Sequence, residues 1–203
     1  MTDLATVLYT EEDIQRRVRE LGREITEAYR GRSPVLVSVL KGGVVFLADL
    51  IRAIDLPLRV DFMSISRYGP GSHATGVVRV LKDLDHDIGG DDVLVVEDII
   101  DTGLTLSYLL SILEAREPAS IQVCTLLDKS VRRIAPLDVR FTGFDCPDRF
   151  VVGYGLDSGE RYRNLPYIVA VSDQGRLSRD PGALEELVRN PELRPAAGTA
   201  PTG

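Results

Sequence analysis

The sequence has 203 residues, of which 44% are hydrophobic and 27% charged, and its formal net charge is −7 at pH 7. These values suit one soluble domain with a substantial core, with room for a small subdomain. The acidic balance argues against nucleic acid or an anionic membrane as the main partner, because both select basic surfaces. It does not exclude a polyanionic small molecule, since local N–H groups, a few cationic side chains and a metal ion can hold phosphates.

No apolar run approaches the ~20 residues of a membrane-spanning helix, and the acidic start Met1-Thr2-Asp3 is unlike a signal peptide. The two cysteines are too few for a disulfide scaffold. We therefore expect a cytoplasmic protein that binds neither membrane nor nucleic acid.

Hydrophobic spacing predicts helices and strands that alternate along the chain. Thr10, followed by three acids, is a typical helix start, and Gly31 is a typical helix end. We expect helices over 10–31, 44–53, 106–115 and 182–189, and strands over 35–40, 58–64, 77–81, 93–98, 121–127, 139–144, 150–153 and 167–172. This alternation favours an α/β fold with a mainly parallel, twisted sheet flanked by helices.

Two segments do not fit the alternation. The run 66–76 is rich in glycine and proline, which predicts a mobile loop. The last residues, 190–203, are rich in Pro, Ala, Gly and Thr, which predicts a disordered tail. We therefore expect a single domain over 1–189.

The strongest chemical signal lies at the end of the apolar strand that begins at Val93. Two adjacent carboxylates, Glu97 and Asp98, end this strand and would be costly to bury unpaired. A short turn and a helix follow, and the turn consists of Asp101, Thr102, Gly103, Leu104 and Thr105. In such a unit the free N–H groups and the positive end of the helix dipole face one point. The pattern predicts a phosphate site, with acids nearby for ribose hydroxyls or a divalent metal.

A purely structural explanation, in which the acids end a strand and Thr102 caps a helix, fits poorly because three acids lie within five residues. Other polar clusters also follow predicted strands, among them Lys41-Gly42-Gly43 and Asp128-Lys129. Ligands of parallel sheets bind at the carboxyl ends of the strands. We therefore expect these clusters to converge.

The run VVEDIIDTGLTL, residues 95–106, resembles the phosphoribosyl-pyrophosphate signature of purine phosphoribosyltransferases, in particular the bacterial hypoxanthine-guanine type. The similarity extends from about residue 10 to about residue 173. It implies a Mg²⁺-dependent purine salvage enzyme that transfers the phosphoribosyl group from phosphoribosyl pyrophosphate to hypoxanthine or guanine, giving IMP or GMP. It also implies a homo-oligomer, dimer or tetramer, and a small hood subdomain from the N- and C-terminal segments over the base site.

The resemblance assigns roles around the phosphate turn. The turn would hold the 5′-phosphate, while Glu97 and Asp98 would face the ribose hydroxyls and are candidate metal ligands. Asp101 would accept a proton near N7 of the purine, and a role as helix cap is compatible with this. The human-type signature has a lysine where this chain has Leu104, which leaves the backbone cradle intact and removes one charge.

By the same resemblance, Lys41 and Gly42 belong to a pyrophosphate loop that follows a cis Leu40–Lys41 peptide bond. Arg163 would also contact pyrophosphate. Asp157 would bind a Mg²⁺ ion that holds pyrophosphate oxygens as well, because Mg²⁺ prefers hard oxygen ligands.

The base pocket is assigned in the same way. Lys129 would donate to the 6-oxo group of the purine, which favours hypoxanthine and guanine over adenine. Phe150 would stack on the ring, Val151 would offer its backbone to the Watson–Crick edge, and Asp157 would lie beside them. Taken without the resemblance, Phe150 is as well explained as a core aromatic and Asp157 as a turn acid.

The loop 66–76 resembles the lid that closes over the reaction in this family. Tyr68 matches the lid tyrosine. The residue before it is commonly serine, whereas this chain has Arg67 there and Ser66 one place earlier. Either residue is a candidate for the lid contact.

Two alternatives remain beside a hypoxanthine-guanine enzyme. One is the same chemistry with xanthine preferred. The other is a regulatory protein that senses phosphoribosyl pyrophosphate on this fold while it binds RNA or DNA. Retention of Asp101, Lys129 and Asp157, together with the acidic charge, argues against the regulator.

Overall fold

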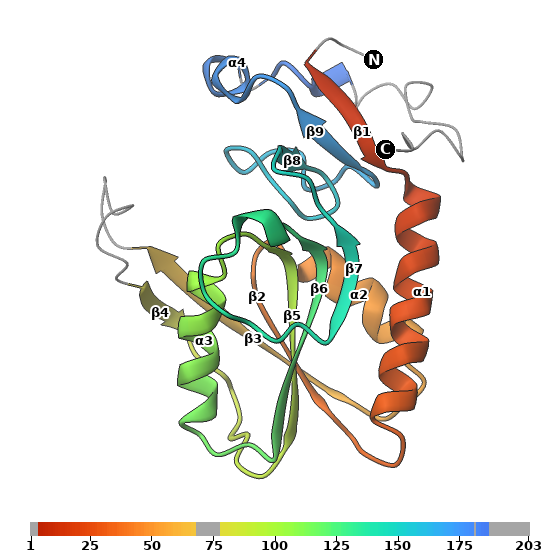
Figure 1. The fold of residues 1–203 in the computed structure, drawn as a ribbon, viewed down its shortest axis with the longest axis vertical. Coiled ribbons are helices and arrows are strands. Elements are labelled where there is room, and N and C mark those ends of the chain that lie inside the picture. Colours follow the sequence, from red (N-terminus) through yellow and green to blue (C-terminus); the bar gives the residue numbers. More distant parts are fainter. Residues whose placement is uncertain (1–3, 68–77, 181, 187–203) are drawn as a thin grey trace.

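The structure, a computed structural model, describes residues 4–67, 78–180 and 182–186 (Figure 1). Within these ranges the strands form one six-stranded and one three-stranded sheet. The predicted tail over 190–203 and most of the predicted loop 66–76 lie outside the described residues. None of the helices in the described ranges is long and apolar enough to span a bilayer.

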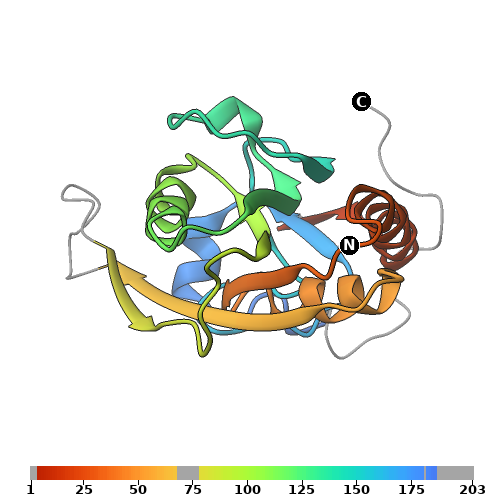
Figure 2. The same cartoon turned by 90° about the horizontal axis from the view of Figure 1, so that it is seen from below.

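The larger sheet has the strand order β4-β3-β2-β5-β6-β7 and is parallel except for its edge strand β4. Its strands are β2 (Val35–Leu40), β3 (Arg59–Arg67), β4 (Val78–Lys82), β5 (Asp92–Ile100), β6 (Ser120–Asp128) and β7 (Phe141–Asp145). The flanking helices are α1 (Glu11–Ala28), α2 (Val44–Ala53) and α3 (Leu104–Glu114). Figure 2 shows α1 and α2 together at one side of the molecule and α3 at the other.

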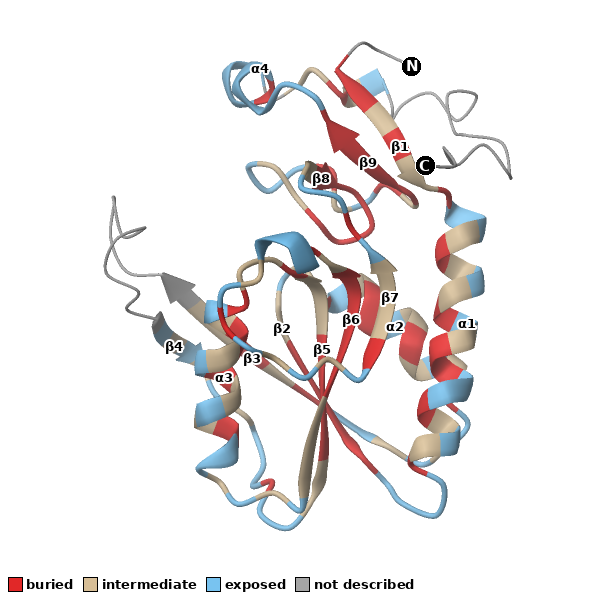
Figure 3. Ribbon diagram, viewed as in Figure 1, coloured by how far each residue is buried: buried red, intermediate tan, exposed pale blue. Residues whose placement is uncertain are grey.

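Alternate residues of the central strands face opposite sides of this sheet. Leu36, Leu94 and Val96 pack in one apolar cluster with α1 and α2, whereas Val35, Val37, Val93 and Val95 pack in another with α3. Because helices cover both faces, consecutive residues of these strands, such as 35–37 and 93–96, are apolar and buried, and Figure 3 shows buried residues along the strands. The predicted α/β fold with a mainly parallel sheet is confirmed.

The smaller sheet joins the two ends of the chain. It consists of β1 (Ala5–Tyr9), β9 (Ile168–Val171) and β8 (Phe150–Val152), paired antiparallel in that order. It has an apolar cluster of its own and lies beyond the end of the larger sheet where β7 ends (Figure 1). This is the position expected for a hood over a site at the carboxyl ends of the parallel strands.

The start of α1 is built as its sequence predicts. The N–H of Asp13 donates to Thr10 Oγ1 at 3.1 Å, and the N–H of Thr10 donates back to Asp13 Oδ2 at 3.3 Å. This capping box satisfies donors that a helix N-terminus leaves free.

Several predicted boundaries need correction. β5 does not end at Asp98 but continues to Ile100, because its pairing with β6 persists as far as the Ile100–Asp128 pair. α3 begins at Leu104 instead of residue 106. Of the helix expected over 182–189, residues 182–184 form a turn and residues 185–186 are helical, while 187–189 lie outside the described residues. β1 and a short helix α4 (Gln174–Arg179) have no counterpart among the expected elements.

Candidate active site

The segments predicted to carry the site converge at the carboxyl ends of the parallel strands. β2 leads into Lys41, β5 into the turn 101–105 and β6 into Lys129. A pocket at this edge is lined by residues of β2, β3 and β5, by the turn and by the first turn of α3, namely Val39, Ile65, Glu97, Ile99, Ile100, Asp101, Thr102, Gly103, Thr105 and Leu106. The phosphate turn and the neighbouring acid Glu97 thus share one cavity.

The turn after β5 requires glycine at position 103. Gly103 is the N-cap of α3 at φ +81°, and a Cβ there would lie 2.7 Å from a methyl of Leu137. The Thr102 carbonyl accepts hydrogen bonds from the N–H groups of Ile134 and Ala135 at 2.9 and 3.2 Å, which tie the turn to the segment after β6. Because Gly103 is the N-cap, the predicted helix-cap role of Asp101 is wrong.

Glu97 and Asp98 lie side by side near the end of β5 and are partly buried. Burial raises the pKa of Glu97 well above its usual value, and the neighbouring Asp98 charge adds to this. Burial also raises the pKa of Asp98 to about 6, although the N–H of Ile99, which donates to Asp98 Oδ1 at 2.8 Å, opposes the rise. Such a pair is poorly stabilised by the protein alone and is suited to ligand hydroxyls or a cation.

Glycine contacts bring the pyrophosphate loop against this acid pair. The Leu40–Lys41 peptide bond is cis, as the resemblance implies. A Cβ at Gly42 would lie only 1.8 Å from Asp98 Oδ2, and a Cβ at Gly155 would lie 2.2 Å from the Gly42 carbonyl oxygen. The loop after β2, the end of β5 and the segment after β8 are therefore in contact, as predicted.

The segment after β8 holds a cluster of charges. Arg163 contacts Asp157 Oδ1 at 3.0 Å and Glu160 Oε1 at 3.2 Å through Nη2, and its Nη1 donates to the Gly155 carbonyl at 2.8 Å. Lys41 Nζ lies 2.7 Å from the other oxygen of Glu160. The two cations predicted for pyrophosphate, Lys41 and Arg163, thus both contact Glu160. The sequence did not indicate a role for Glu160.

Asp101 is paired with a second residue that the sequence did not single out. Arg132 Nε lies 2.9 Å from Asp101 Oδ1, and Arg132 Nη1 lies 3.3 Å from Asp148 Oδ1. Asp148 comes two residues before Phe150 at the start of β8. Arg132 therefore links the end of β5 to the predicted base platform.

The predicted base residues occupy three different environments. Lys129 is 6% exposed, and its ammonium has no hydrogen-bond or ion-pair partner within the described residues. Phe150 is partly buried against the apolar cluster of the smaller sheet, and Val151 is buried and paired with Ala170. The ammonium of Lys129 is not among the fully buried side-chain atoms that lack a partner in the described residues, and its N–H donors suit a ligand acceptor such as an oxo group.

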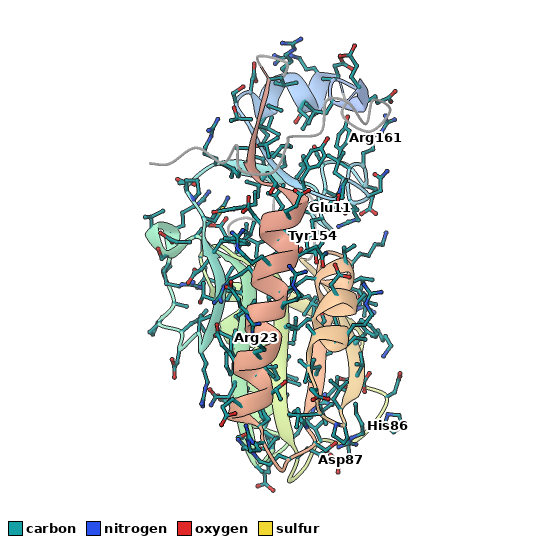
Figure 4. All side chains as sticks on the ribbon, turned by 90° about the vertical axis from the view of Figure 1, so that its right-hand side faces the viewer. Glu11, Arg23, His86, Asp87, Tyr154 and Arg161 are labelled. Atoms are coloured by element: carbon teal, nitrogen blue, oxygen red, sulfur yellow. The ribbon has the colours of Figure 1, made fainter. Side chains whose placement is uncertain are left out.

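Tyr154 anchors the segment after β8 to the helices. Its hydroxyl donates to Asp49 Oδ2 at 2.7 Å, and Gln15 Nε2 donates to the same oxygen at 2.6 Å. The contact joins residues 105 positions apart in the sequence, which is why no local pattern predicted it. Figure 4 shows Tyr154 and Arg161 in the part of the molecule opposite His86, which is exposed.

Two further predictions concern the lid and the metal. The backbones of Ser66 and Arg67 extend β3 by pairing with β4, so these residues are not in a loop, and Tyr68 lies outside the described residues. Glu97, Asp98 and Asp157 do not form a three-ligand cage, and no other group of three acid, histidine or cysteine residues does so in the described ranges.

A family model for the phosphoribosyl transferase domain matches residues 6–159. The chain belongs to the phosphoribosyltransferase family. This membership accounts for the strand–turn–helix unit at 92–114.

Three phosphoribosyltransferases illustrate the similarity. The hypoxanthine-guanine phosphoribosyltransferase of Mycobacterium avium is 55% identical over 172 residues, which are 82% of this chain and 85% of the relative. That of Bacillus subtilis is 52% identical over 166 residues, 82% of this chain and 92% of the relative. The crystal structure of a Staphylococcus aureus hypoxanthine phosphoribosyltransferase matches with a TM-score of 0.80 at 48% identity, over 83% of this chain and 92% of that one.

These similarities confirm the resemblance to hypoxanthine-guanine phosphoribosyltransferases. They support a transferase of purine salvage over a regulatory protein on the same fold.

Proposed function

We propose that this phosphoribosyltransferase transfers the 5-phosphoribosyl group from phosphoribosyl pyrophosphate to hypoxanthine or guanine, giving IMP or GMP and pyrophosphate. The observation that carries the proposal is the contact of Gly42 with Asp98 and of Gly155 with Gly42, because it joins the loops needed for sugar, pyrophosphate and base. The names of the M. avium and B. subtilis relatives support the choice of bases.

The turn 101–105 is proposed to bind the 5′-phosphate. Its backbone N–H groups, the N-terminus of α3 and the hydroxyls of Thr102 and Thr105 supply donors in the lined pocket. Glu97 and Asp98 are proposed to accept hydrogen bonds from the ribose hydroxyls, which would also relieve the burial of their charges.

Reaction at the sugar carbon requires a departing pyrophosphate and a purine nitrogen that has lost its proton. Lys41 and Arg163 are proposed to neutralise the pyrophosphate, with the Gly42 backbone next to it. Asp101 is proposed to accept the purine proton at N7, held beside the turn by Arg132. Lys129 then donates to the 6-oxo group while Phe150 stacks on the ring.

Magnesium is part of the proposal because the donor set suits it. Mg²⁺ is commonly bound through one or two carboxylates together with substrate phosphate oxygens and water, so the absence of a three-ligand cage in the described residues is compatible with it. Asp157 is the proposed carboxylate, with Asp98 nearby. When bound, the ion would neutralise charge on the pyrophosphate.

The remaining proposals concern the context of the enzyme. The domain is proposed to span 1–189, with the three-stranded sheet as a hood. We propose a cytoplasmic homo-oligomer that binds neither nucleic acid nor membrane, in keeping with its net charge of −7. The lid with Ser66, Arg67 and Tyr68 stays a prediction.

The proposal is tested by incubating purified protein with phosphoribosyl pyrophosphate and Mg²⁺, with hypoxanthine, guanine, xanthine or adenine in separate reactions. Nucleotide formation is followed by chromatography. We expect IMP and GMP at comparable rates and little AMP. Faster formation of XMP would transfer the assignment to xanthine, and no nucleotide from any base would contradict the proposal.

A further inference from the structure

Glu160 contacts both cations assigned to pyrophosphate. Its Oε2 lies 2.7 Å from Lys41 Nζ, and its Oε1 lies 3.2 Å from Arg163 Nη2. Lys41 follows β2 and Arg163 follows β8, so a single carboxylate bridges two separate segments. The two oxygens of Glu160 thus lie where two oxygens of a bound anion would be expected.

The backbone places Glu160 for this contact. Its N–H donates to Asp157 Oδ2 at 2.9 Å, and Ser158 and Arg161 exchange two backbone hydrogen bonds of 3.2 Å around it. Glu160 itself adopts φ +65°, a conformation that costs free energy for a residue other than glycine. These contacts fix the backbone of Glu160 at a place from which its side chain reaches Lys41 and Arg163.

The carboxylate of Glu160 is shared between two cationic side chains, Lys41 and Arg163. Its side chain is 64% exposed, so it is free to move away when a stronger anion arrives. Arg163, at 25% exposed, is held from other sides by Asp157 and Gly155, and so stays in place when Glu160 leaves.

We propose that Glu160 is an internal competitor of pyrophosphate: it occupies Lys41 and Arg163 in the free enzyme, positions them, and is displaced when pyrophosphate or the pyrophosphoryl group of the substrate binds. This inference rests on the proposed function. Competition by Glu160 weakens the binding of the product pyrophosphate, because Glu160 returns to the two cations as pyrophosphate leaves. Exposed ion pairs are individually weak, so the competition is worth about three- to tenfold in affinity.

The test compares Glu160→Gln with wild type. The substitution keeps the size of the side chain and removes its charge. Affinity for pyrophosphate in the presence of Mg²⁺ is measured by calorimetry, and product inhibition by pyrophosphate is measured during IMP synthesis. We expect Kd and the inhibition constant to fall about three- to tenfold. Unchanged or weaker binding by a folded Glu160→Gln protein would overturn the proposal.

Glu185→Gln is the matched control. Glu185 pairs with Arg161 at 3.1 Å in the same region, and the substitution changes the net charge equally. We expect its pyrophosphate affinity to match wild type. If Glu185→Gln tightens binding as much as Glu160→Gln does, the effect is one of overall charge and the proposal fails.

A double-mutant cycle separates competition from a structural effect. In a Lys41→Gln background one of the two contested cations is absent, so Glu160→Gln should improve pyrophosphate affinity by a smaller factor. The same factor in both backgrounds would contradict the proposal. If Glu160→Gln does not fold, Glu160→Asp is measured instead. Its shorter carboxylate reaches the two cations less well, so the affinity for pyrophosphate should also increase. Unchanged affinity would contradict the proposal.

These outcomes are distinguishable from failure of the proposed function. If the wild-type protein makes IMP but the Glu160→Gln variant binds pyrophosphate with the same affinity as wild type, only the inference is overturned. Wild-type protein that makes no nucleotide with any base overturns the assignment of the pyrophosphate site itself.

Discussion

Arg132 forms an ion pair with Asp101, in which Nε lies 2.9 Å from Oδ1. The same arginine reaches Asp148 at 3.3 Å, so it connects the turn after β5 to the loop before Phe150. Both pairs are substantially exposed and contribute little stability. Their value is positional, because they hold the proposed proton acceptor at one place beside the turn.

Asp101→Asn tests the proton acceptor. The amide has the size of the carboxylate but does not take up a proton, so kcat should fall by roughly 10²-fold or more while substrate binding is retained. Asp148→Asn, which alters the other partner of Arg132, should stay within about threefold of wild type. A near-normal rate for Asp101→Asn in a steady-state assay would remove the proposed role.

Lys129→Met tests recognition of the 6-oxo group. Methionine fills the buried position without a charged donor, so KM for hypoxanthine and guanine should rise by roughly 10- to 100-fold, as expected for a lost hydrogen bond to a charged group. KM for phosphoribosyl pyrophosphate should change little. If the oxopurine KM values are also unchanged, Lys129 does not contact the base.

Gly42→Ala tests the contact that joins the loops. The added Cβ would lie 1.8 Å from Asp98 Oδ2, so the loop or the acid must shift, and KM for phosphoribosyl pyrophosphate should rise at least tenfold. Gly89→Ala is the control, because its Cβ would have no neighbour closer than 3.4 Å. Wild-type kinetics for Gly42→Ala would show that the loop is not held against Asp98.

Asp98→Asn tests the cost of the buried acid. Burial raises the Asp98 pKa to about 6 in the folded protein, so the folded state binds a proton more tightly than the unfolded state. Wild type should therefore lose stability as the pH rises from about 4 to about 6. At pH 7 the variant should be more stable by about 2–3 kcal/mol, and the difference should shrink toward pH 4.

Urea unfolding at several pH values measures this difference, with Asp55→Asn as an exposed control. A variant that is less stable than wild type at pH 7 would show that Asp98 is stabilised in the free protein. The same variant should lose activity, since acids retained at a cost to stability are commonly functional.

The sequence was most informative where the structure is local. The apolar strand from Val93, the turn at 101–105 and the helix after it follow from adjacent residues, and so does the cap at Thr10. The end of β5 was misjudged because acids usually terminate strands. The end of β5 is set by the pairing of Ile100 with Asp128 of the neighbouring strand β6. The sequence of β5 alone does not reveal this pairing.

Long-range partners were the main omission. The contacts of Asp101 with Arg132, of Lys41 with Glu160 and of Tyr154 with Asp49 join residues 31 to 119 positions apart. β1 was missed for a similar reason, since five residues acquire their strand identity only by pairing with β9 at the other end of the chain. The resemblance assigns candidate ligand-binding residues, but it does not identify the protein groups that contact them.

The central claim is that one crevice binds phosphate, sugar and purine together. A crystal structure of the protein with IMP tests it most directly. We predict the phosphate within hydrogen-bond distance of the N–H groups of the turn 101–105, the purine against Phe150 and its 6-oxo group near Lys129. IMP bound with its phosphate away from that turn, or with its purine away from Phe150, would contradict the account.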